Sequence, residues 1–110
     1  MSNSKTLILF HDTEQKAIEQ LDVLLRGNNV RIERIVSYSH TNPPSGYYDQ
    51  EEHEWVCVIE GEAKLMFEDG IEVQLKRGDS MLLEAHKKHR VSYTSNPCIW
   101  LCVFYSASKE

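Results

Sequence analysis

The stretch Tyr48–Gly61, YDQEEHEWVCVIEG, joins a polar, acidic half to an apolar half. Glu54 stands directly before the apolar residues 55–58, and Gln50 lies four positions before Glu54. The apolar run, closed by a glycine, is typical of a buried β-strand. A carboxylate at the head of such a strand predicts a polar group at the rim of a hydrophobic interior.

The rest of the chain after Asn29 also alternates with the period of a β-strand. Strands are expected within 30–39, 80–84, 89–95 and 98–105, and 62–79 has the pattern of a hairpin. In that hairpin, Asp69-Gly70 has the composition of a two-residue type I′ turn. The segment 41–46, with two prolines and a glycine, is expected to be a loop. Short strands separated by turns every 8 to 12 residues predict an all-β sandwich or barrel.

One helix is predicted at the N-terminal end, over residues 12–26. Asp12 is a suitable N-cap, and Gly27 follows as a stop signal. Helical spacing brings five apolar residues to one face, namely Ala17, Ile18, Leu21, Leu24 and Leu25. We therefore expect an N-terminal segment with a packed helix over 1–28, a barrel over 29–106 and a disordered tail over 107–110.

Composition limits the classes of partner. The net charge is −5, which argues against a nucleic-acid surface because phosphate binding requires clustered Lys and Arg. No window approaches the ~20 apolar residues of a transmembrane helix. The apolar run near the start is too short for a signal peptide, so we expect a cytoplasmic protein without membrane contact. The three cysteines form no CxxC pair and are expected to be free, mostly buried thiols.

Alternation also predicts which polar groups meet. On regular strands Gln50 and Glu54 share one face, and His89, Val91 and Tyr93 share another. Glu54 and His89 each head a strand whose same face is apolar further along. Two such groups suit the mouth of a barrel, where polar side chains converge above a hydrophobic floor.

Residues 46–61 and 78–93 together resemble the two motifs of the cupin superfamily. In the first motif Gly46, Glu54 and Gly61 match the opening glycine, the glutamate and the closing glycine. In the second, Gly78-Asp79 matches the opening and His89 the histidine. The resemblance implies a small single-domain cupin of the type-2 kind: an antiparallel β-barrel of jelly-roll type, here with one N-terminal α-helix.

The resemblance also implies a metal site. A standard cupin holds Fe, Mn, Zn or Ni with three histidines and a glutamate. Here Tyr48 and Gln50 stand where the family has its paired histidines, so the first motif is degenerate. The expected ligands of a divalent metal are Gln50, Glu54 and His89, and His86 is a candidate replacement from the adjacent turn.

Three interpretations of this polar cluster stay open. It holds a divalent metal, it forms a metal-free pocket for a small molecule, or Glu54 and His89 are an ion pair that closes one end of the barrel. The expected substrate pocket is Tyr48, Gln50, Tyr93 and His86. The first interpretation favours an enzyme of isomerase or dioxygenase type acting on a small polar metabolite. The alternative is a metal-free binding or sensor domain without catalysis. Doubly apolar strands and exposed strand edges predict a homodimer.

Overall fold

The computed structural model describes residues 18–106, which form eight strands. These are β1 (Gln20–Arg26), β2 (Val30–Ser37), β3 (His53–Glu60), β4 (Glu62–Phe67), β5 (Glu72–Lys76), β6 (Ser80–Leu83), β7 (His89–Thr94) and β8 (Cys98–Tyr105). The predicted all-β antiparallel class is confirmed. Among residues 18–106 no helix is long and apolar enough to cross a membrane.

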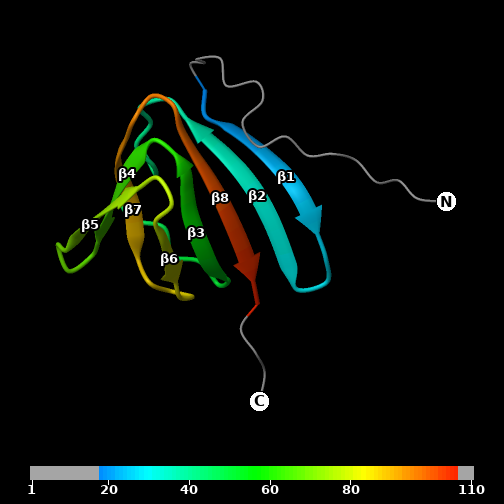
Figure 1. The fold of residues 1–110 in the computed structure, drawn as a ribbon. Helices are drawn as coiled ribbons and strands as arrows, with labels where there is room; N and C mark the ends of the chain where they lie inside the picture. The colour runs from blue at the N-terminus through cyan, green and yellow to red at the C-terminus, as the bar shows by residue number, and fades with distance from the viewer. Residues whose placement is uncertain (1–17, 107–110) are drawn as a thin grey trace.

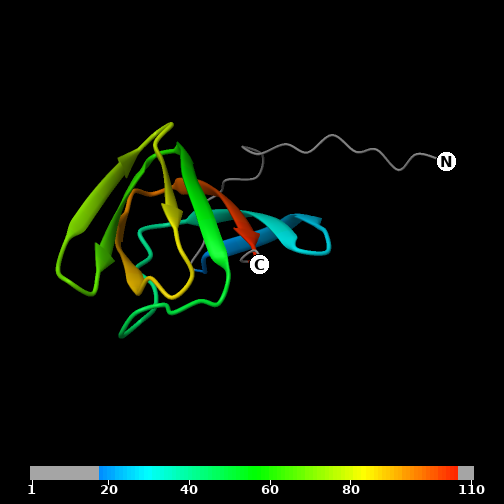
Figure 2. The ribbon, with the colours of Figure 1, turned by 90° about the horizontal axis from the view of Figure 1, so that it is seen from below.

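The strands are arranged in two sheets. One has five strands in the order β1-β2-β8-β3-β6, and the other has three in the order β5-β4-β7 (Figure 1). Figure 2 shows that β1 and β2 extend sideways, beyond the part of the large sheet that faces the small one. The large sheet therefore has one part covered by the small sheet and one part that projects from it.

The main core lies between the two sheets and follows from strand alternation. On β3 as far as Val58, and along all of β4, every second residue is buried, whereas the residues between are only partly buried. The cluster consists of Val56, Val58, Ala63, Leu65, Phe67, Leu75, Leu83, Cys98, Trp100, Cys102 and Phe104. A smaller cluster of Val36, Tyr38 and Ile99, with Ile59 against it, is formed by residues of the large sheet and the loop after β2. Both clusters use β8, which is why that strand is apolar on both faces.

The helix predicted over 12–26 is wrong for residues 20–26, which form β1, and residues 12–17 lie outside the described residues. β1 pairs with β2 along its whole length, from Gln20 opposite Val36 to Arg26 opposite Arg31. Asp22 of β1 forms an ion pair with Arg34 of β2, with 2.5 Å between the carboxylate oxygen and the guanidinium nitrogen. The amphipathic helical pattern is only a weak preference over seven residues, and pairing with β2 overrides it. Gly27, expected as the helix stop, instead donates its N–H to the carbonyl of Val30 in the β1–β2 turn.

The predicted hairpin over 62–79 is confirmed as β4 and β5, but its turn type is wrong. The N–H of Gly70 bonds the carbonyl of Phe67, and the N–H of Phe67 bonds the carbonyl of Ile71. Of the two residues predicted to be central, Asp69 and Gly70, only the glycine has positive φ, at 90°. A type I′ turn requires positive φ at both central residues, so the connection is a type I turn followed by a glycine bulge.

Candidate functional site

A cavity of about 200 Å³ lies against the inner face of the large sheet. Its walls come from both sheets, from the loop between β2 and β3, and from the residues around the start of β1. The described residues that line it are Glu19, Leu21, Glu33, Ile35, Asn42, Tyr48, Gln50, Glu54, Val56, Leu65, Leu83, His89, Val91, Trp100, Cys102 and Phe104. The cavity is smaller than the ~300–1,000 Å³ of drug-sized sites, so a small metabolite fits it best.

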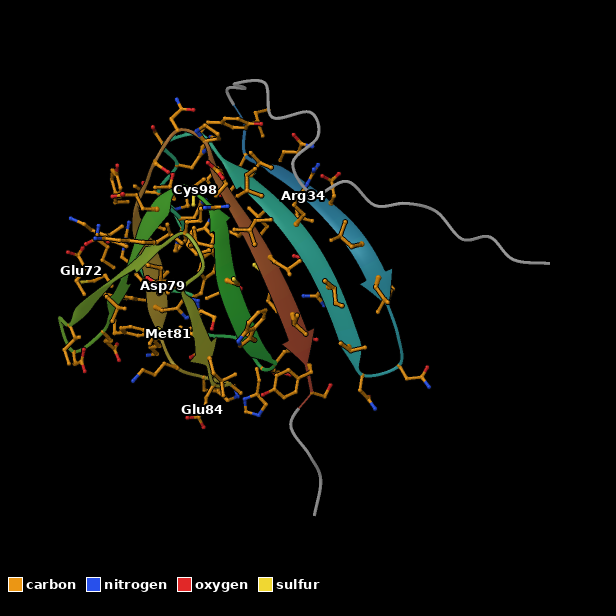
Figure 3. The ribbon with its side chains drawn as sticks, viewed as in Figure 1. Arg34, Glu72, Asp79, Met81, Glu84 and Cys98 are labelled. Atoms are coloured by element: carbon orange, nitrogen blue, oxygen red, sulfur yellow. The ribbon has the colours of Figure 1, made fainter. Side chains whose placement is uncertain are left out.

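Glu54 lies at the start of β3, at one end of the molecule. It pairs with Leu83 at the end of β6. In Figure 3 the next residue, Glu84, is at the lower end, and Cys98 of β8 is at the upper end. The side chain of Glu54 is buried and accepts a hydrogen bond of 3.1 Å from the amide of Gln50.

The pKa of Glu54 is raised, and the main cause is burial, which removes water from the carboxylate. The hydrogen bond from Gln50 and the nearby His89 act in the opposite direction but do not outweigh burial. The thiol of Cys102 also hydrogen-bonds Glu54, and the carboxylate in turn helps to raise the pKa of that thiol well above its ordinary value. Glu54 is therefore a carboxyl group that can hold a proton in an apolar surrounding.

His89 faces Glu54 from the small sheet. Its Nε2 lies 4.0 Å from Oε1 of Glu54, and its side chain is likewise buried. Its Nδ1 is 2.8 Å from the carbonyl oxygen of Lys87. A carbonyl only accepts, so Nδ1 carries the hydrogen of this bond, and Nε2 is the nitrogen that faces Glu54.

Tyr48 and Gln50 reach the cavity from the loop before β3. The N–H of Tyr48 donates to the carbonyl of His89 at 2.7 Å, and the two rings lie 5.6 Å apart. The carbonyl of Gln50 accepts from the N–H of His86 at 2.7 Å. Two backbone contacts thus fix this loop beside His89 and His86, and Tyr48, Gln50, Glu54 and His89 all line the cavity.

Tyr93 does not join this group, and the expectation that it shares a face with His89 and Val91 is wrong. Lys64 of β4 pairs with Tyr93, but the next residue, Leu65, pairs with Val91, so Ser92 is an extra residue in β7. Such a β-bulge reverses the side-chain alternation beyond it. Val91 lines the cavity, whereas Tyr93 is 42% exposed and lies beneath the ammonium group of Lys64.

His86 also lies away from the cavity. Its ring is exposed and its Nδ1 is 2.8 Å from a carboxylate oxygen of Asp49. The residue has a left-handed backbone, with φ of 66°. Of the four residues expected to form the substrate pocket, the structure therefore brings Tyr48 and Gln50 to the cavity and leaves Tyr93 and His86 outside.

Two acidic lining residues, Glu19 and Glu33, were not predicted from the sequence. Glu19 was missed because its segment was expected to be helical. Glu33 could have been found, because it lies two residues before Ile35 and therefore on the same face of β2. The two residues pair with Cys102 and Trp100 of β8. Trp100 is buried, lines the cavity and donates its indole N–H to Ser37 at 3.1 Å.

The donor set does not fit the metal shell that the resemblance implied. Within residues 18–106 no three His, Cys, Asp or Glu side chains are grouped so that they could hold one ion. Gln50 turns its amide N–H, not its carbonyl oxygen, toward Glu54. Burial and the carboxylates of Glu19 and Glu54 raise the pKa of Tyr48, which disfavours a phenolate ligand. Glu54 and His89 remain as two strong donors, half of a four-ligand site.

Similarity to known proteins identifies the family of this chain. The family model described as Cupin domain matches residues 38–104, which cover both motifs and the Glu54–His89 site. The chain belongs to the cupin family. A structure from Ralstonia eutropha JMP134 named as a "putative mannose-6-phosphate isomerase" is 33% identical, with a TM-score of 0.88, and the match covers 94% of this cupin and all of the other chain.

Two further structures are similar in fold at low identity. A cupin superfamily protein from Desulfitobacterium hafniense DCB-2 is 16% identical, with a TM-score of 0.74 and coverage of 86% and 83% of the two chains. DMSP lyase DddQ from Ruegeria pomeroyi DSS-3 is 13% identical, with a TM-score of 0.70, and the match covers 84% of this chain but 49% of the other. A comparison with curated protein sequences finds no match. Members of the cupin superfamily often bind metals.

Proposed function

We propose that this cupin binds a small polar metabolite in the cavity and isomerises it by proton transfer at Glu54 and His89. The observation that carries the proposal is the buried pair itself. Oε1 of Glu54 and Nε2 of His89 face each other at 4.0 Å on the wall of a cavity. A carboxyl group with a raised pKa beside an imidazole of fixed orientation is a typical acid–base pair.

The reaction needs only groups that the chain supplies. One partner removes a proton from the carbon next to a substrate carbonyl, and the other delivers a proton to the carbonyl oxygen. Reversal on the neighbouring carbon returns both protons, so an isomerisation leaves no net proton, electron or atom to balance. The name of the Ralstonia eutropha relative, an isomerase, supports this class over the dioxygenase class.

Proton exchange provides the test. Mannose, mannosamine and mannose 6-phosphate are incubated with the protein in D2O, and loss of the C2 proton is followed by NMR. We expect exchange with at least one of them to be about 100-fold slower or more in Glu54→Gln and in His89→Gln, the usual effect of removing a general acid or base. The matched control is Glu68→Gln, which makes the same substitution at an exposed position.

Two results would contradict the proposal. Binding in the cavity without exchange would leave the metal-free binding or sensor domain as the function. An exchange rate that survives both Glu54→Gln and His89→Gln would move the chemistry away from this pair.

A further inference from the structure

The charge of the cavity wall selects the class of ligand. Three carboxylates line the cavity, from Glu19, Glu33 and Glu54. None of its lining residues within 18–106 is lysine or arginine. A phosphate or carboxylate ligand would therefore meet like charges in a partly desolvated space, where repulsion is several times stronger than in water.

The three carboxylates differ in whether a basic side chain of the protein lies beside them. Glu33 is held at 2.7 Å by the guanidinium of Arg31, which also pairs with Glu52 at 3.2 Å. Glu54 is opposite His89, with Oε1 of the carboxyl group 4.0 Å from Nε2 of the imidazole. Each of these two carboxylates therefore already faces a basic side chain of the protein.

Glu19 is different, because the described groups that bind it are neutral. One of its carboxylate oxygens accepts from the hydroxyl of Ser37, and the other accepts from the amide of Asn42 at 2.9 Å. Its negative charge also helps to raise the pKa of Tyr48 and of Cys102, two other lining residues. The charge of Glu19 therefore acts on other residues of the cavity lining, as the charge of Glu54 also does.

The apolar walls complement this charge. Tyr48, Trp100 and Phe104 supply aromatic side chains, and aromatic faces attract cations. One such contact is already made at Phe104, whose ring lies 4.3 Å from the guanidinium carbon of Arg31. An aromatic and acidic cavity suits a small molecule with an apolar or neutral body and a positive group.

We infer that the ligand of this cavity is a small organic cation, such as a primary amine, and is not a phosphate ester. The inference rests on the proposed function, since it concerns the same cavity. Glu19 is the residue assigned to ligand charge, separate from the proton-transfer pair. It also separates this cupin from an enzyme for sugar phosphates, despite its 33% identity to a relative with a sugar-phosphate name.

Three probes with one aromatic body and different charges test the inference: benzylamine, benzyl alcohol and benzyl phosphate. Each is titrated at pH 7 into ¹⁵N-labelled protein, and the indole N–H signal of Trp100 and the amide signal of Gln50 are followed. We expect benzylamine to saturate at a concentration about tenfold or more below that of benzyl phosphate, with benzyl alcohol between them. Added salt should narrow the difference.

Two variants test whether Glu19 causes the preference for benzylamine. In Glu19→Gln the preference for benzylamine over benzyl phosphate should fall severalfold, with benzyl alcohol unchanged. Glu68→Gln, which removes an exposed carboxylate outside the cavity lining, should keep the wild-type preference.

The failures of the two proposals are distinguishable. Equal or tighter binding of benzyl phosphate in the cavity would overturn the inference and leave cavity binding intact. An unchanged preference in Glu19→Gln would overturn the role of that residue. If none of the three probes shifts the Trp100 and Gln50 signals, the inferred ligand class is wrong, whereas the proposed proton transfer is overturned only by the exchange experiment.

Discussion

Oε1 of Glu54 and Nε2 of His89 lie 4.0 Å apart, although 34 residues separate them in the chain and they come from different sheets. β3 brings the carboxyl group and β7 brings the imidazole. The hydrogen bond from Nδ1 to the carbonyl of Lys87 then turns the ring so that Nε2 faces the carboxyl group. The pair is thus positioned by backbone and by sheet packing, before any ligand binds.

The raised pKa of Glu54 predicts a pH dependence of stability. Folding favours the protonated carboxyl, so its contribution is fully present below the ordinary pKa of 4.5 and is lost as pH rises through the raised value. Glu54→Gln removes this loss while keeping a hydrogen-bonding side chain. We expect the variant to gain free energy of unfolding relative to wild type as pH rises from 4.5 to 7, reaching on the order of 1 kcal/mol. Urea unfolding across this range measures it, and a difference that is constant with pH would contradict it.

The metal content should be low. No three His, Cys, Asp or Glu side chains of residues 18–106 are grouped to hold one ion, so we expect purified protein to contain far less than one equivalent of Fe, Mn, Zn or Ni. The double variant Glu54→Ala, His89→Ala should contain the same small amount. Elemental analysis after growth in metal-supplemented medium measures both. Stoichiometric metal in the wild type that disappears in the double variant would restore the metal interpretation.

Gly61 should not tolerate a side chain. It lies between β3 and β4 with φ of 85°, and an added Cβ would lie 2.3 Å from Oγ of Ser95 and 2.6 Å from the carbonyl oxygen of Pro97. Gly61→Ala should cost roughly 1–3 kcal/mol for backbone strain, plus the cost of the clash. Gly70→Ala is the matched control, because its φ is 90° and nothing lies within 4 Å of the added atom. Equal losses of unfolding free energy in the two variants would show that the clash is relieved without cost.

The three thiols should differ in reactivity. Cys98 and Cys102 are buried, and burial raises the pKa of Cys98 to about 12. Cys57 is only partly buried. The thiolate is the reactive form, so a chromogenic thiol reagent at pH 8 should label Cys57 first. The other two should react only after denaturation. Rapid labelling of Cys98 or Cys102 in the folded Cys57→Ser variant would contradict this prediction.

The predicted homodimer now has a definite candidate surface. β1 lies at the edge of the five-stranded sheet, and its Leu21 and Val23 are 55% and 43% exposed. Edge strands with apolar side chains tend to pair with other chains. Light scattering at micromolar concentration should give twice the 12.8 kDa of one chain. Val23→Lys should lower it to the monomer, and Leu82→Lys, on the opposite edge strand, should not. A wild-type monomer would remove the proposal.

The sequence was sufficient for the features that depend on regular alternation. The apolar run after Glu54 and the placement of Glu54 and His89 at strand heads were enough to predict that these two side chains meet. Alternation failed at Tyr93, because the extra residue Ser92 reverses the face of β7 and leaves no signal in the residue types. Helical spacing failed at β1 for a different reason. The segment satisfies both periods, and only its long-range pairing with β2 decides between them.

Trp100 provides the protein with a built-in optical reporter. Its indole lies on the cavity wall, whereas Trp55 is the neighbour of the lining residues Glu54 and Val56 on β3 and is itself outside the lining. Side chains alternate along a strand, so Trp55 points to the other face of the sheet. In a Trp55→Phe variant, the tryptophan fluorescence would come from Trp100 alone, because the chain has two tryptophans. Any compound that enters could then be detected by a change in emission, without a label and whatever its chemical identity.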